Sequence, residues 1–174
     1  MDTSFEHYVE TELAPNLAAH DKPSILLLTC IDYRYAHRIL DVMDSKGLRR
    51  KYDIFSLAGA AAGATQVPAW RDVLVAHIKV AREIKHPIDR VIILEHRDCG
   101  AYTKFFNLEW AKVLPPVETA SHLREVTLLA KDLKKEFKKD IPNLKVDSFL
   151  LARDEDDVLQ TEPSNKKSTK RRSA

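Results

Sequence analysis

Short apolar runs alternate along the chain with stretches in which apolar residues recur every three or four positions. The runs are typical of buried strands, and the recurring stretches are typical of amphipathic helices. We predict strands over Ser24–Cys30, Tyr52–Ala58, Arg90–Glu95 and Lys145–Ala152. We predict helices over Ser4–His20, kinked or split at Pro15, and over Tyr35–Lys46, Pro68–Lys85 and Val117–Lys139.

Strands that alternate with helices favour an α/β fold, in which helices cover both faces of a parallel sheet. We therefore predict a four-stranded parallel sheet core flanked by helices, with an N-terminal helical arm. The expected boundaries are 1–22 for the arm, 23–159 for the sheet domain and 160–174 for a disordered basic tail. The small residues Gly59–Ala64 are expected to form a loop, and no clear pattern marks the residues between about Gly100 and Leu114.

Composition narrows the class of protein. With 174 residues, 44% hydrophobic and 31% charged, the chain suits one globular domain. No apolar stretch approaches the roughly 20 residues that span a bilayer, and the acidic N-terminus does not resemble a secretory signal. We therefore expect a cytoplasmic protein without a membrane partner. The net charge is +2, but five basic residues follow Pro163, so the rest of the chain carries a net charge of about −3. This negative charge argues against a nucleic-acid-binding surface on the folded domain.

Both cysteines lie at the ends of apolar runs, within two short motifs. Cys30 ends the first predicted strand, and His96 follows the third, with Cys99 three residues later. In a cytosolic chain such a pair favours metal binding over a disulfide. Two thiolates and one imidazole suit a zinc ion with a position left for water, the pattern of catalytic zinc. If the two strands are neighbours, the ligands meet where the strand order of the sheet reverses.

Asp32 and Arg34 supply the chemistry that a bare zinc site lacks. In an extended segment, residues two apart face the same side, so Cys30, Asp32 and Arg34 can share one space. Asp32 could coordinate zinc or accept a hydrogen bond from a zinc-bound water. Arg34 could pair with this carboxylate and keep it ionised and off the metal. The bound water would then have a pKa of about 7 and act as a nucleophile.

The pairing of Cys30-x-Asp32-x-Arg34 with His96-x-x-Cys99-Gly100 resembles the β-class carbonic anhydrases. The resemblance runs from about Ser24 to Ala152. It implies reversible hydration of carbon dioxide to bicarbonate and a proton by zinc-bound hydroxide. It also implies Cys30, His96 and Cys99 as zinc ligands, and Asp32 with Arg34 as the catalytic pair. A homodimer or an assembly of dimers is implied too, with the N-terminal arm lying on the partner.

Several positions depart from the family pattern and keep two alternatives open. The residue before the ligand histidine, usually glycine, is Glu95, and Tyr33 replaces a small residue between Asp32 and Arg34. The protein could instead hydrolyse a sulfur analogue such as carbonyl sulfide or carbon disulfide. It could also be a catalytically silent zinc-binding regulatory paralogue. The remaining helical histidines are expected to be packed or surface residues: His37, His77, His86 and His122.

Overall fold

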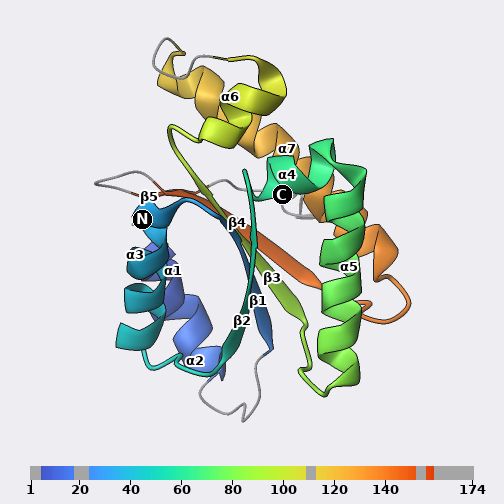
Figure 1. Ribbon diagram of the computed structural model, residues 1–174. Helices are drawn as coiled ribbons and strands as arrows, with labels where there is room; N and C mark the ends of the chain where they lie inside the picture. Colours follow the sequence, from blue (N-terminus) through green and yellow to red (C-terminus); the bar gives the residue numbers. More distant parts are fainter. Residues whose placement is uncertain (1–4, 18–23, 109–112, 152–155, 159–174) are drawn as a thin grey trace, which may run out of the picture.

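A five-stranded sheet forms the centre of the computed structural model, which describes residues 5–17, 24–108, 113–151 and 156–158. Its order is β2-β1-β3-β4-β5 (Figure 1). The strands are β1 (Ile25–Cys30), β2 (Tyr52–Leu57), β3 (Arg90–His96), β4 (Lys145–Leu151) and β5 (Asp156–Val158). The first four are parallel, so the predicted α/β class and four-stranded parallel core are confirmed. The short β5, which was not predicted, pairs antiparallel to β4.

The central strands β1 and β3 are buried on both faces, which explains why their sequences are continuous apolar runs. One face carries Leu26, Leu28, Val91 and Ile93, and the other carries Ile25, Leu27, Ile92 and Leu94. Each side of the sheet therefore needs its own layer of helices.

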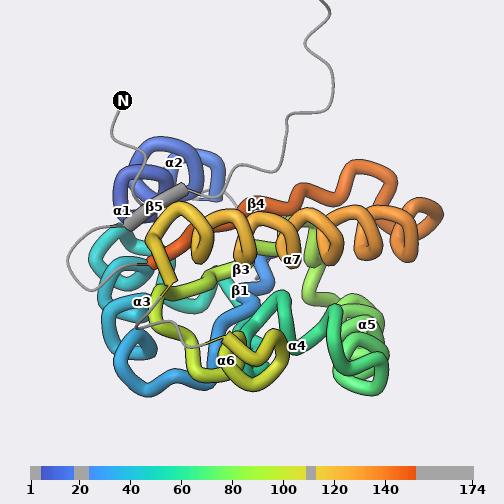
Figure 2. Tube along the Cα trace, turned by 90° about the horizontal axis from the view of Figure 1, so that it is seen from above, coloured from blue at the N-terminus to red at the C-terminus, as the bar shows by residue number. Residues whose placement is uncertain are grey.

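Helices supply both layers. On one side lie α5 (Pro68–Glu83) and α7 (Pro115–Glu136), and on the other lies α3 (Tyr33–Ser45) with the N-terminal turns (Figures 1 and 2). Pro68 starts α5, where its missing N–H costs no intrahelical bond. The three predicted helices are confirmed, with bounds that shift by a few residues.

The N-terminal segment is helical without interruption from Phe5 to Leu17, in three consecutive parts, and its ladder is irregular just before Pro15, where a kink or split was predicted. The three parts are α1 (Phe5–Tyr8), the π-helical η1 (Val9–Leu13) and α2 (Ala14–Leu17). Pro15 has no N–H to donate to the preceding turn, which accounts for the break in the α-helical ladder. Rings of Phe5 and Tyr8 pack against Phe149 of the same chain. The segment is thus part of its own chain's core, whereas the expected boundary at 22 and the tail 160–174 lie outside the described residues.

Two short helices, one of them in a stretch expected to be a loop, complete the fold. The expected loop Gly59–Ala64 contains most of α4 (Ala61–Gln66), and α6 (Gly100–Phe106) follows the second motif. Alanine has the highest helix propensity, and Ala60, Ala61 and Ala64 are buried in the core, so small residues here serve close packing rather than flexibility. Across the described ranges, no helix has the length and apolar character needed to cross a membrane.

Candidate metal centre

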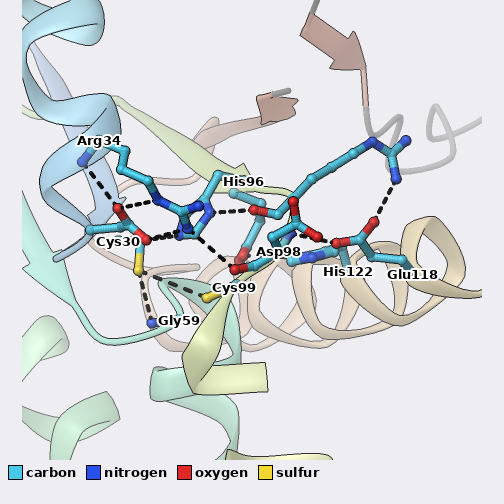
Figure 3. Close-up of polar contacts among 11 residues, drawn as sticks. Cys30, Arg34, Gly59, His96, Asp98, Cys99, Glu118 and His122 are labelled. Carbon is cyan, nitrogen blue, oxygen red and sulfur yellow. Dashed lines mark hydrogen bonds and ion pairs between the residues drawn. The ribbon is translucent and has the colours of Figure 1, made fainter. Parts of the chain in front are cut away.

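The strand order brings the two motifs together at the carboxyl edge of the sheet. Cys30 ends β1, His96 ends β3, and these strands are hydrogen-bonded neighbours. Cys99 is the N-cap residue of α6. One donor atom from each of the three side chains lies within 4.8 Å of the other two, and the two sulfurs are 3.9 Å apart (Figure 3). The three predicted ligands therefore form a cluster that could hold a metal ion.

The orientation of the His96 ring suits a metal ligand. Its Nδ1 lies 2.8 Å from the carbonyl oxygen of Arg97 and donates to it, so the proton is on Nδ1. Nε2 is buried and has no hydrogen-bond partner among the described residues. Tyr35 stacks on the ring with centroids 4.6 Å apart. A ligand histidine commonly donates its second N–H to a carbonyl in this way, which leaves Nε2 for the metal.

The two sulfurs are close enough for one thiol to donate to the other. The pKa of Cys30 is lowered to about 4, chiefly because Cys99 donates to its sulfur, although burial opposes this change. His96 and the Gly59 N–H, which is 3.3 Å from the Cys30 sulfur, lower this pKa further. The pKa of Cys99 is raised by the same contact and by burial. Metal binding requires thiolates, so an ion would displace the remaining proton.

Asp32 and Arg34 form a two-point ion pair beside the ligands. Arg34 donates through Nε to Oδ1 at 2.9 Å and through Nη2 to Oδ2 at 2.7 Å. Asp32 also caps α3, because the Arg34 backbone N–H donates to Oδ1 at 3.0 Å. The Arg34 hydrogen bonds lower the pKa of Asp32 to about 2. Asp32 Oδ2 lies 3.6 Å from His96 Nε2, so the carboxylate borders the ligand cluster.

A further carboxylate fixes the loop between His96 and Cys99. Glu118 of α7 accepts the Asp98 backbone N–H at 2.7 Å and Arg97 Nη1 at 2.9 Å. Asp98 has a φ of 55°, and its carbonyl oxygen accepts from Arg34 Nη2 at 3.2 Å. These contacts join the second motif to both Arg34 and α7 (Figure 3).

Behind the ligands lies a buried polar group that the motifs did not indicate. Glu95 and His122 are both 0% exposed, with Glu95 Oε2 3.1 Å from His122 Nδ1. The Tyr102 ring lies against His122, and Glu125 is 1% exposed nearby on α7. His122 was expected to be a packed or surface residue. It is packed in the core, and its ring nitrogen contacts the Glu95 carboxylate. The sequence signal was its place on the apolar stripe of α7, in register with the buried Val126 and Leu129.

The donor set agrees with zinc chemistry. Two sulfurs and one imidazole nitrogen are ligands that zinc prefers, and three protein ligands leave one coordination position. A bound cation would take the lone pair of the buried His96 Nε2, which has no hydrogen-bond partner in the described part of the chain, and both sulfurs as thiolates.

Comparisons with known proteins give relatives and structural neighbours, while no protein-family model matches the chain. Crystal structures of tetrameric β-carbonic anhydrases from Sordaria macrospora align with 14% identity and a TM-score of 0.44, covering 80% of this chain and 81% of theirs. The β-carbonic anhydrase CafA of Aspergillus fumigatus aligns with 17% identity and a TM-score of 0.48, covering 82% and 77%.

Two rickettsial sequences are more similar to this one. An uncharacterized protein of Rickettsia bellii (strain RML369-C) is 30% identical over 141 residues, which are 80% of this chain and 82% of the relative. An uncharacterized protein of Rickettsia conorii (strain ATCC VR-613 / Malish 7) is also 30% identical over 141 residues, covering 80% and 73%. The chain belongs to the family of these two Rickettsia proteins.

Proposed function

We propose that this protein is a zinc enzyme that reversibly hydrates carbon dioxide to bicarbonate and a proton. In this proposal Cys30, His96 and Cys99 hold the zinc, and Asp32 with Arg34 forms the catalytic pair. The observation that carries it is the arrangement at the sheet edge. Three zinc-type donors lie within 4.8 Å of one another, and an ionised carboxylate held by arginine borders them. The likeness of the motifs to β-class carbonic anhydrases supports the same conclusion.

Each member of the pair has a separate task. Bound zinc would supply a Lewis acid that makes water a nucleophile near neutral pH. Asp32 accepts a hydrogen bond from the nucleophile and so orients it toward the substrate. Arg34 keeps Asp32 ionised, since its two hydrogen bonds are made to the charged form. Arg34 also holds the carboxylate at the border of the ligand cluster, close enough to act on it.

An apolar hollow beside Cys30 supports a small uncharged substrate. Its volume is about 280 Å³, and aliphatic side chains of Ile39, Leu40 and Ile54 form much of its wall. An uncharged, apolar gas loses little hydration on entering such a space, whereas an ion would lose a great deal. Carbon dioxide is such a molecule, and Cys30 is the proposed site residue that lines this hollow.

The proposal is tested by stopped-flow hydration of carbon dioxide with protein of measured zinc content. Asp32→Ala should keep zinc and lose the rate by about 100-fold or more, because it removes the residue that orients the nucleophile. Cys99→Ser should lose zinc and rate together. Asp72→Ala is the matched control, since Asp72 is exposed on α5, and it should hydrate at the wild-type rate.

Full zinc occupancy with no hydration above buffer would contradict the proposal. Carbonyl sulfide offered to the same sample would then distinguish a hydrolase of sulfur analogues from a silent zinc-binding paralogue. We also propose a homodimer, as the resemblance implies, and light scattering of the zinc-loaded protein measures it.

A further inference from the structure

Glu95 lies where a charged residue is unexpected, next to a metal ligand and fully inside the protein. Building on the proposed zinc function, we propose that Glu95 is a positioning residue for the metal centre. It anchors the turn at 59–61, whose backbone N–H in turn fixes the sulfur of Cys30. Glu95 touches neither the metal nor the substrate in this role.

The carboxylate points away from the ligands. Successive residues of a strand face opposite sides of the sheet, so Glu95 and His96 diverge at the end of β3. His96 stacks on Tyr35 of α3, while Glu95 reaches the α4 and α7 side. There Oε1 accepts the backbone N–H of Ala61 at 2.8 Å, and Oε2 accepts from His122 Nδ1 at 3.1 Å. Both carboxylate oxygens are therefore used, in a site closed to water.

The turn that Glu95 holds contains a strained residue. Ala62 N–H donates to the Gly59 carbonyl oxygen at 2.8 Å, which closes a four-residue turn. Ala60, its first central residue, has a φ of 39° and a ψ of −103°. This is the region that a II′ turn uses at that position, where glycine is preferred because it lacks a Cβ. An alanine keeps this conformation only where its surroundings enforce it.

Two anchors enforce it, one on each side of Ala60. On one side the Gly59 N–H donates to the sulfur of Cys30 at 3.3 Å. On the other side the Ala61 N–H donates to Glu95. A change at Glu95 would let the turn relax, and the relaxed turn would move or release the N–H that holds the Cys30 sulfur. Glu95 thus links His96, its neighbour in the chain, to Cys30 on the adjacent strand.

Zinc affinity measured by competition with a chromogenic chelator tests this role directly. Glu95→Ala should bind zinc about tenfold more weakly or worse, the cost typical of an outer-shell contact. Glu95→Gln keeps an oxygen for the Ala61 N–H and should stay within about twofold of the wild type by the same reasoning. Where Glu95→Ala does not fold, Glu95→Asp replaces it, because its shorter side chain cannot reach both partners.

Glu125→Ala is the matched control. Glu125 is also buried, and its Oε2 accepts Gln66 Nε2 at 3.0 Å at the far end of α4, away from the turn. Its loss should leave zinc affinity unchanged. The absorption of cobalt bound in place of zinc gives a second readout, since its charge-transfer band reports on both ligand thiolates and should shift in Glu95→Ala but not in Glu125→Ala.

Rescue separates positioning from general packing. Ala60→Gly removes the strain, so in the Glu95→Ala or Glu95→Asp background it should restore part of the zinc affinity and the cobalt band. Unchanged affinity in a folded Glu95→Ala, equal losses in Glu95→Ala and Glu125→Ala, or no rescue by glycine would each overturn the inference. A wild-type protein that binds no zinc would instead overturn the proposed function itself.

Discussion

Gly59 satisfies two demands that no other residue meets together. Its φ is +75°, a conformation that costs an L-residue roughly 1–2 kcal/mol. A Cβ built on it would also lie 2.9 Å from the Cβ of Ala101 in α6, the helix that Cys99 caps. The backbone can therefore approach both α6 and the Cys30 sulfur only because this residue has no side chain.

We expect Gly59→Ala to weaken zinc binding by about tenfold, as loss of an outer-shell contact does, and to lower the melting temperature. Gly47→Ala is the control, because Gly47 has a φ of +76° but open space around its Cβ position. The two variants share the conformational cost, and only Gly59→Ala adds a clash, at a residue whose N–H donates to the Cys30 sulfur. Chelator competition and thermal unfolding measure both effects, and a zinc affinity equally reduced in both variants would contradict the expectation.

Some residues of the site can be recognised from the sequence, and others cannot. Cys30, Asp32, Arg34, His96 and Cys99 are recognisable because their spacing along strand ends carries the chemistry, and the fold brings all five together. Their supporting carboxylates were not recognised, since a buried glutamate has no local signature. Glu95 and Glu118 acquire their roles only from α4 and α7, which come from distant parts of the chain.

At the scale of elements, the N-terminal turns are held to the sheet by a small polar group as well as by apolar contacts. Tyr8 donates to Asp147 Oδ2 at 2.7 Å, and Arg90 Nη1 donates to the same oxygen at 2.9 Å. Burial, and then the charge of Asp147, raises the pKa of Tyr8 well above its usual value. The folded protein therefore keeps this phenol neutral.

That contact should make the protein sensitive to alkali. Above the ordinary tyrosine pKa of about 10, the unfolded chain loses the Tyr8 proton while the folded chain retains it, so stability falls as pH rises. We expect urea midpoints to fall more steeply between about pH 9 and 11 for the wild type than for Tyr8→Phe. Tyr33→Phe, at a position 84% exposed, should follow the wild type. Identical slopes for all three proteins would count against this contact.

Elements with strong periodicity could be predicted, and those defined by packing could not. The strands β1 to β4 and the helices α3, α5 and α7 follow from apolar runs and helical spacing. The small residues Gly59–Ala64 gave no periodic signal for α4, which is a helix packed against α7. Pro15 indicated a break, but only the contacts of Phe5 and Tyr8 show that the segment covers its own sheet.

At the scale of the whole molecule, the position of the site follows from strand order. Chain alternation predicted a parallel sheet, and the pairing of β1 with β3 places the order reversal between Cys30 and His96. Which strands are neighbours depends on how the crossovers pack, so the sequence allowed the pairing of β1 with β3 only as an assumption. Because β1 and β3 are neighbours, their ligands lie at the edge where open α/β sheets bind ligands.

This strand order has a kinetic consequence. Between β1 and β3 the chain passes through α3, β2, α4 and α5, so the two halves of the metal centre meet only after a long crossover has closed. Closing such a segment is entropically costly and belongs to the slow part of folding. A metal ion that needs the completed edge stabilises the native state without stabilising the path toward it. A refolding rate that rises with zinc would mean that the crossover closes early. We expect instead that stopped-flow refolding proceeds at the same rate with and without zinc, while unfolding slows with zinc bound. Zinc thus determines how long the folded state lasts rather than how fast it forms.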